Sequence, residues 1–135
     1  MDRTDELLEK YGLVPETEYL EVIRKLLIDE IENNNSEDNE YLKTLCIKLF
    51  SLGNVEDTYL IWRAKNKNFD TGCYIDIQLL CGAGIEETKK YLSNDLSNDA
   101  FDELSYIENG VISGDFNDFS RAKIIKFYKE YYGIE

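Results

Sequence analysis

The chain has 135 residues, a length typical of one folded domain, and its 43% hydrophobic and 32% charged residues predict a globular protein rather than a disordered one. The formal net charge of −13 argues against direct nucleic-acid binding and favours a basic protein partner. The absence of histidine excludes Cys–His zinc sites and the Ser–His–Asp and Cys–His catalytic arrangements.

Membrane attachment and disulfide bonds are not expected. No apolar run approaches the roughly 20 residues of a membrane-spanning helix, and the charged start MDRTDELLEK lacks the apolar region of a signal peptide. Cys46, Cys73 and Cys81 lie among apolar residues, so we expect three reduced thiols in the core. Together these features predict a cytoplasmic protein.

The first third of the chain predicts two helices. A short amphipathic helix covers residues 2–11 and ends at Gly12. Pro15 fits the first turn of a second helix. That helix runs to about residue 31, because apolar residues recur at intervals of three and four: Leu20, Ile23, Leu27 and Ile31. Three asparagines then break the pattern, and Ser36 or Asp38 can cap the next helix.

A further helical stripe precedes Gly53 and consists of Leu42, Leu45, Cys46 and Leu49. Another helix begins near Val55 and carries Trp62. Asp70 is well placed as the N-cap of the element that follows. In that element, residues 73–81 alternate between apolar and other side chains, which by itself is a strand pattern.

An internal repeat favours a helix there instead. The segment TLCIKLFSLGNVEDT (44–58) aligns with YIDIQLLCGAGIEET (74–88) at a constant offset of 30 residues, and a weaker third copy places Phe116 at the position of Ile85. Since the first copy has helical spacing, we predict a helix in the second as well. The last helix is then expected to run from about Phe116 to Tyr132.

The repeat predicts an all-α fold of stacked antiparallel helical hairpins, similar to an αα-superhelix, with about seven or eight helices and no sheet. Residues 1–135 form one domain, in which hairpins cover about 37–66, 70–95 and 99–132. Gly53, Gly84 and Gly114 are expected to permit the tight turns, and the acids after them to favour the positive end of the next helix.

The segment GNVEDTYLIWRAK (53–65) resembles the second half of a tetratricopeptide repeat, with a turn glycine, two acids and an aromatic residue at Gly53, Glu56, Asp57 and Trp62. Thr58 replaces the small residue of that family, and the period of 30 or 31 differs from the usual value of about 34. HEAT-like packing fits the pattern as well. The resemblance implies stacked helical hairpins and binding of a protein or peptide.

Six residues are candidates for partner binding, each with a structural alternative. Trp62 and Arg63 are typical interface anchors, although a lone tryptophan also suits a core. Asp76 lies within an apolar run and is expected to pair with Arg63 or Lys65 on the preceding helix, to lie at a solvated edge, or to face a partner. The remaining candidates are acids that can equally serve as a helix cap or first-turn residues: Asp70, Glu86 and Glu87. No catalytic, cofactor-binding or metal-binding motif is present.

The sequence favours a non-enzymatic protein–protein interaction module. Its most concrete form is an acidic antidote that masks a basic toxin such as a nuclease, as bacterial immunity proteins do. One alternative is a scaffold or adaptor subunit with a helical-repeat fold, which an exposed apolar end near Tyr131 and Tyr132 would support. The other is a small carboxylate-dependent hydrolase, which would require acids with raised pKa values in a pocket.

Overall fold

The computed structural model describes residues 2–134, which form eight α-helices and three short 3-10 helices without any strand. The all-α class predicted from the sequence is therefore confirmed. The α-helices are α1 (Arg3–Tyr11), α2 (Leu20–Glu32), α3 (Asn39–Leu52), α4 (Thr58–Lys65), α5 (Phe69–Tyr74), α6 (Ile85–Ser93), α7 (Asn98–Ser113) and α8 (Arg121–Tyr132). The 3-10 helices are η1 (Thr17–Tyr19), η2 (Val55–Asp57) and η3 (Ile77–Cys81). Within the described residues, no helix combines the length and apolar character needed to cross a bilayer.

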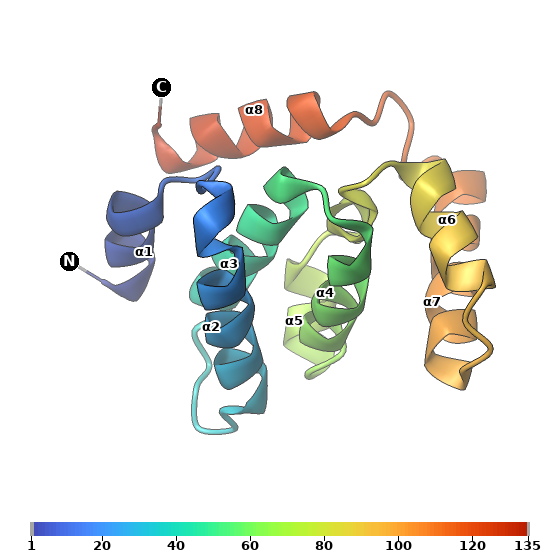
Figure 1. The fold of residues 1–135 in the computed structure, drawn as a ribbon, viewed down its shortest axis with the longest axis horizontal. Coiled ribbons are helices and arrows are strands. Elements are labelled where there is room, and N and C mark those ends of the chain that lie inside the picture. Colours follow the sequence, from blue (N-terminus) through green and yellow to red (C-terminus); the bar gives the residue numbers. More distant parts are fainter. Residues whose placement is uncertain (1, 135) are drawn as a thin grey trace.

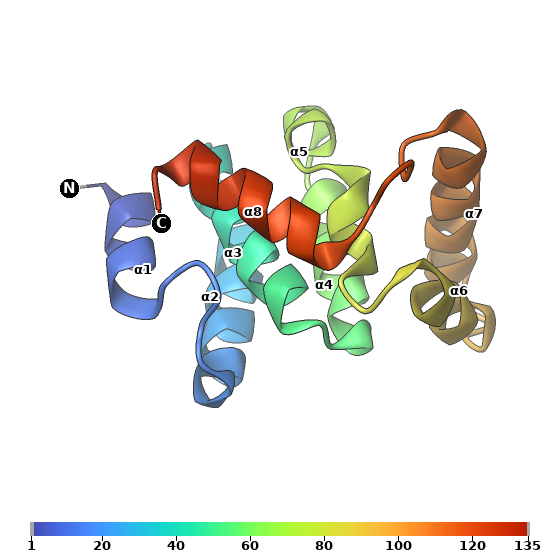
Figure 2. The same cartoon turned by 90° about the horizontal axis from the view of Figure 1, so that it is seen from above.

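The first seven helices stand in a row, and α8 lies across the ends of these helices on one side of the row (Figure 1). The row begins with α1 and finishes with α6 and α7, which pack against each other. Seen from above, α8 lies over α3 near the middle of the row (Figure 2), and these two helices are in contact. The chain therefore returns from the α7 end to cover its own centre.

Helix α3 is the centre of the fold and packs against α1, α2, α4, α5, η3 and α8. Asp38 caps its start by accepting a 3.1 Å hydrogen bond from the Tyr41 backbone N–H. Gly53 ends it in the left-handed conformation, with φ of 72°. All ten residues from Leu42 to Ser51 are buried, including two lysines. One of these, Lys48, is 0% exposed and donates a hydrogen bond to the Gly12 carbonyl, and burial lowers its pKa to about 8.

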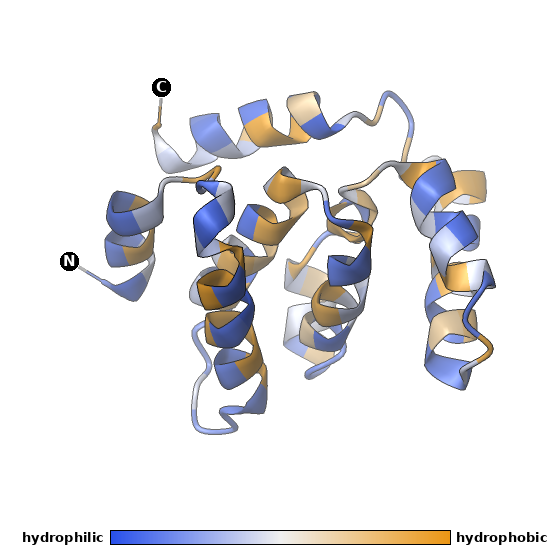
Figure 3. Ribbon diagram, in the orientation of Figure 1, coloured by the Kyte–Doolittle hydropathy of each residue, from blue (hydrophilic) through white to orange (hydrophobic). Residues whose placement is uncertain are grey.

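The other helices of the row are amphipathic. Apolar and polar residues, coloured orange and blue in Figure 3, alternate around the ribbons of α2 and α4. An ion-pair network ties α2 to the turn before α4: the guanidinium of Arg24 lies 2.7 Å from Asp57 and 3.1 Å from Glu56. The hydrogen bond with buried Asp57 raises the pKa of Arg24. The sequence predicts Glu56 and Asp57 only as first-turn acids. Through Arg24 they also link the turn before α4 to α2.

Residues 73–81 do not form the regular α-helix that the repeat predicted. Helix α5 ends at Tyr74, Ile75 is extended with φ of −94° and ψ of 115°, and the chain resumes as η3. At the break, the ammonium of Lys65 donates to the carbonyls of Gly72 and Ile75, so that these groups have partners without a continued α-helix.

The predicted cap of α5 is also corrected. Asp70 lies inside the first turn, whereas Asn68 is the N-cap. The Asn68 side chain accepts from the Thr71 N–H at 2.9 Å, and the Thr71 hydroxyl accepts from the Asn68 N–H at 3.0 Å. This reciprocal capping box satisfies two N–H groups that the helix leaves open, which a lone Asp70 cap would not do.

Three further expectations differ from the structure. Helix α8 begins at Arg121 and not at Phe116, because the Ser120 hydroxyl caps it while buried Phe116 packs against Phe119. Pro15 precedes a 3-10 turn, so α2 starts only at residue 20. The thiol of Cys73 is exposed, since α5 turns it away from the core in which Cys46 and Cys81 are buried.

Candidate functional site

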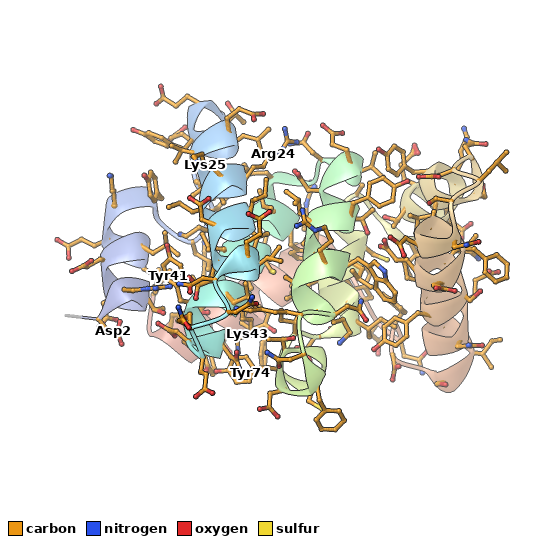
Figure 4. All side chains as sticks on the ribbon, turned by 90° about the horizontal axis from the view of Figure 1, so that it is seen from below. Asp2, Arg24, Lys25, Tyr41, Lys43 and Tyr74 are labelled. Atoms are coloured by element: carbon orange, nitrogen blue, oxygen red, sulfur yellow. The ribbon has the colours of Figure 1, made fainter. Side chains whose placement is uncertain are left out.

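A groove of 450 Å³ lies at the ends of α2, α4 and α7 that are remote from α8, and we refer to it as the Trp62 groove. Three other grooves of the described residues are smaller, at 200, 310 and 400 Å³. Figure 4 views the molecule from this side, with the side chains of α4 and α7 filling the space between the two ribbons. The lining residues come from three separate segments: Ile31 and Asn34; Trp62, Arg63, Asn66 and Lys67; Asp99 and Asp102.

Two aromatic rings join the walls of the groove. In α4, Ile61 and Ala64 are buried in the core, which leaves Trp62 half-buried at the side of the helix that faces α7. The indole ring lies 5.4 Å from the ring of Tyr106 on α7, with an angle of 55° between the planes. Of the two rings, only that of Trp62 lines the groove, and its contact with Tyr106 joins α4 to α7 beside it.

The cationic groups of the groove are directed toward α2. The guanidinium of Arg63 lies 3.7 Å from the carboxylate of Glu32. The ammonium of Lys67 donates to the carbonyls of Glu30 and Asn33 at 2.9 and 3.0 Å. These carbonyls belong to the last turn of α2 and to its C-cap, where a positive charge is favourable to the helix dipole.

The anionic groups lie on the opposite wall. Asp99 and Asp102 are exposed and three residues apart on α7, so their side chains are neighbours on one face of the helix. Within residues 2–134, neither carboxylate has an ion-pair partner within 4.0 Å. Both belong to the stretch from Tyr91 to Ser120, which contains seven acids and no lysine or arginine.

The groove thus separates its charges, with basic groups committed to α2 and acids without partners on α7. Such an arrangement can bind a cationic side chain against α7, while an aromatic ring contacts the same side chain. A carboxylate or carbonyl of the same ligand can then accept from the Arg63 guanidinium.

Of the six residues predicted to bind a partner, only Trp62 and Arg63 share this groove. Asp70 is exposed on α5, and Glu87 is exposed in the first turn of α6. Glu86 lines a separate groove of 310 Å³ between α6 and α7. The structure therefore disperses four of the six residues.

The pairing predicted for Asp76 is wrong. Its carboxylate is exposed and accepts a 2.8 Å hydrogen bond from the hydroxyl of Tyr128 on α8, and it forms no ion pair with Arg63 or Lys65. Lys65 is instead occupied by backbone carbonyls, and Arg63 faces Glu32. Sequence reasoning also missed Asp99 and Asp102, for which the lack of bases between residues 91 and 120 was an available signal.

A second cluster of aromatic and charged groups is already filled by the chain itself. The ammonium of Lys43 lies 4.2 Å from the ring centre of Tyr74, 4.6 Å from that of Tyr131 and 5.6 Å from that of Tyr128. Glu40 lies 3.9 Å from the same ammonium and accepts from the Tyr131 hydroxyl at 3.1 Å. This cage joins α3, α5 and α8, and its contacts are structural.

The most perturbed carboxyl group lies away from the groove. Glu103 on α7 is 0% exposed, and burial raises its pKa to about 8. It accepts a hydrogen bond from the Thr58 hydroxyl through Oε2, while Oε1 has no partner. No group of three or more His, Cys, Asp or Glu residues within the described chain is arranged to hold a metal ion.

Comparison of the chain with protein-family models, with curated proteins and with solved structures gave no match. The resemblance of residues 53–65 to a tetratricopeptide repeat therefore has no support from these comparisons. In this segment Gly53 ends α3, and Trp62 on α4 lines the groove. The function is therefore inferred from the groove and from the charge of the surface around it.

Proposed function

We propose that the protein is a non-enzymatic interaction module that binds a basic partner protein. The observation that carries the proposal is the pair of carboxylates without partners, Asp99 and Asp102, beside an accessible tryptophan in the Trp62 groove. Aromatic side chains at a partly open groove supply contact area, and acids without partners attract cationic side chains.

The charge of the whole chain supports the same partner. The sequence has 28 acids and 15 bases, and burial removes three of each from the surface: Glu30, Asp57 and Glu103; Lys43, Lys48 and Lys65. The excess of negative charge therefore lies on the solvent-facing surface of the protein, which a partner contacts first. Such a field accelerates association with a basic protein and repels nucleic acid. An antidote to a basic toxin is the most specific form of this proposal.

The alternative of a carboxylate-dependent hydrolase requires acids with raised pKa values in a pocket, and the described grooves contain none. Such an enzyme needs a carboxyl group with a raised pKa that a substrate can reach. Burial raises the pKa of both Glu103 and Asp57, but neither residue lines any of the four described grooves. Glu103 is held by Thr58, and Asp57 is held by Arg24.

Selection from a library of random short peptides against the immobilised protein tests the proposal. We expect the retained peptides to be enriched in lysine and arginine, and their binding to weaken as salt is added. Parallel selection against a variant with Asp99→Asn and Asp102→Asn should reduce this enrichment. Retention of neutral or acidic peptides at both low and physiological salt would contradict a basic partner.

The outer face of α7 favours a second candidate function, that of a scaffold subunit. Phe101 and Ile112 are 68% and 84% exposed, and their spacing places both on the side of α7 that is opposite to buried Ile107. Helix α7 is at the end of the row, where a helical array normally has a polar cap (Figure 1).

Sedimentation velocity at low and high salt distinguishes this second candidate. Since the acids of α7 repel one another, self-association through this face should increase when salt screens them. Replacement of Phe101 and Ile112 by serine should then abolish the association. A monomer at every salt concentration would leave the scaffold function without support.

A further inference from the structure

We infer that the Trp62 groove binds an arginine side chain of the partner, with the guanidinium placed between the Trp62 ring and the carboxylates of Asp99 and Asp102. This inference rests on the proposed function, since it names the group of a basic partner that the groove selects. It makes the groove an anchoring point within a larger acidic surface.

The first argument is the shape of the cationic group. A guanidinium is planar and stacks on an aromatic ring while its N–H groups donate sideways to carboxylates. The groove presents both elements together, because Trp62 on α4 contacts Tyr106 on α7 and the two acids lie on α7 as well. An ammonium group is compact and holds its water more strongly, so it gains less from a half-open aromatic site.

The second argument is that two acids are available. Asp99 and Asp102 are exposed neighbours on α7, and five N–H groups of a guanidinium suffice to contact both. The chain's own cations leave them vacant: Arg63 lies against Glu32, and Lys67 donates to the end of α2. The groove volume of 450 Å³ is large enough to receive a long side chain together with part of its backbone.

The third argument concerns the opposite wall. Arg63 is 48% exposed, and its 3.7 Å separation from Glu32 leaves N–H groups for a ligand. A backbone carbonyl or carboxylate next to the bound arginine can accept from this guanidinium. The two walls therefore fix the direction in which a partner segment crosses from α4 to α7.

Fluorescence of the protein's single tryptophan provides a direct readout of the site. The probes are three amidated peptides of glycine and alanine that differ only in carrying arginine, lysine or citrulline at the same positions. We expect the arginine peptide to change the Trp62 emission saturably and to bind several-fold more tightly than the lysine peptide. The citrulline peptide keeps the shape without the charge and should bind least.

Two double variants with the same loss of charge separate groove binding from long-range attraction. Asp99→Asn with Asp102→Asn should weaken the arginine peptide about tenfold, because charge-assisted hydrogen bonds are removed. Asp115→Asn with Asp118→Asn alters two exposed acids outside the groove and should cause only a small change. Trp62→Leu, measured by calorimetry, should weaken the arginine peptide more than the lysine peptide.

Each remaining outcome has a distinct meaning. If the two double variants weaken binding of the arginine peptide equally, the arginine site is overturned. The proposal of a basic partner that binds the acidic surface is then retained. Equal binding of the arginine and lysine peptides would overturn the selection of a guanidinium. Failure of the native protein to bind either cationic peptide, even at low salt, would overturn both the site and the proposed function.

Discussion

The hydroxyl of Tyr128 on α8 donates a 2.8 Å hydrogen bond to the carboxylate of Asp76, in the extended link between α5 and η3. Tyr128 is also the one buried residue among those of α8. Other contacts of the helix are polar as well, including a 2.6 Å hydrogen bond between Tyr132 and Thr44 and a 3.2 Å bond from Arg121 to the Gly82 carbonyl. Helix α8 is thus held on the row by polar groups and aromatic rings together with the partly buried Ile124 and Ile125, which pack against the core.

A double-mutant cycle between Tyr128→Phe and Asp76→Ala should reveal a coupling free energy of about 1 kcal/mol in chemical unfolding. The value is modest because Asp76 is exposed to water. Asp70→Ala is the matched control, since Asp70 is an exposed acid of the neighbouring α5. Tyr128→Phe should show a smaller coupling free energy with Asp70→Ala than with Asp76→Ala. Equal couplings would refute a specific hydrogen bond between Tyr128 and Asp76.

Stability should fall as the pH rises, because of Glu103. Burial raises the pKa of this carboxyl from 4.5 to about 8, so the folded protein binds more protons than the unfolded chain between these values. The contribution is complete below pH 4.5 and is lost as the pH rises through 8, a change of about 5 kcal/mol in the free energy of unfolding.

Glu103→Gln keeps the hydrogen bond from Thr58 without an ionisable proton. Urea denaturation at a series of pH values should therefore show a flatter profile for this variant, and greater stability than the native protein at pH 9. Glu108→Gln makes the same chemical change at an exposed position of α7 and should preserve the native profile. If Glu103→Gln also preserves it, Glu103 does not titrate as a buried acid.

Gly82→Ala should destabilise the protein by about 1–3 kcal/mol through steric overlap. A β-carbon on Gly82 would lie 2.7 Å from the carbonyl oxygen of Phe50 and 3.1 Å from its Cα, both in the rigid backbone of α3. Gly72→Ala is a milder control, since the nearest atom is the Lys65 carbonyl oxygen at 3.3 Å. Thermal unfolding of the two variants should rank Gly82→Ala as clearly less stable, and the reverse order would contradict this contact.

Local signals predicted local structure well. The stripe from Leu42 to Leu49 and the glycine at position 53 indicate α3 and its end, and the structure has both. The alternation in residues 73–81 was also informative, because Ile75 is extended there. The repeat comparison overrode this signal, since it could not show that Lys65 would occupy the carbonyls of α5.

Long-range relationships were beyond such reasoning. The partner of Asp76 lies 52 residues away on a helix that crosses the row, so no spacing rule connects the two. Residue type alone predicts Trp62 and Arg63 as interface anchors. The opposite wall of their groove required the packing of α7 beside α4, which the positions of Asp99 and Asp102 in the sequence do not specify.

The buried lysines restrict how the protein can be modified covalently. Lys48 and Lys65 each donate to backbone carbonyls, and Lys43 fills a cage of three tyrosine rings. Acetylation or ubiquitination at any of these ammonium groups requires the surrounding helices to separate first. Regulation of the folded chain through lysine is therefore confined to solvent-facing positions such as Lys123 and Lys126 on α8, where loss of a charge would leave the protein still more acidic.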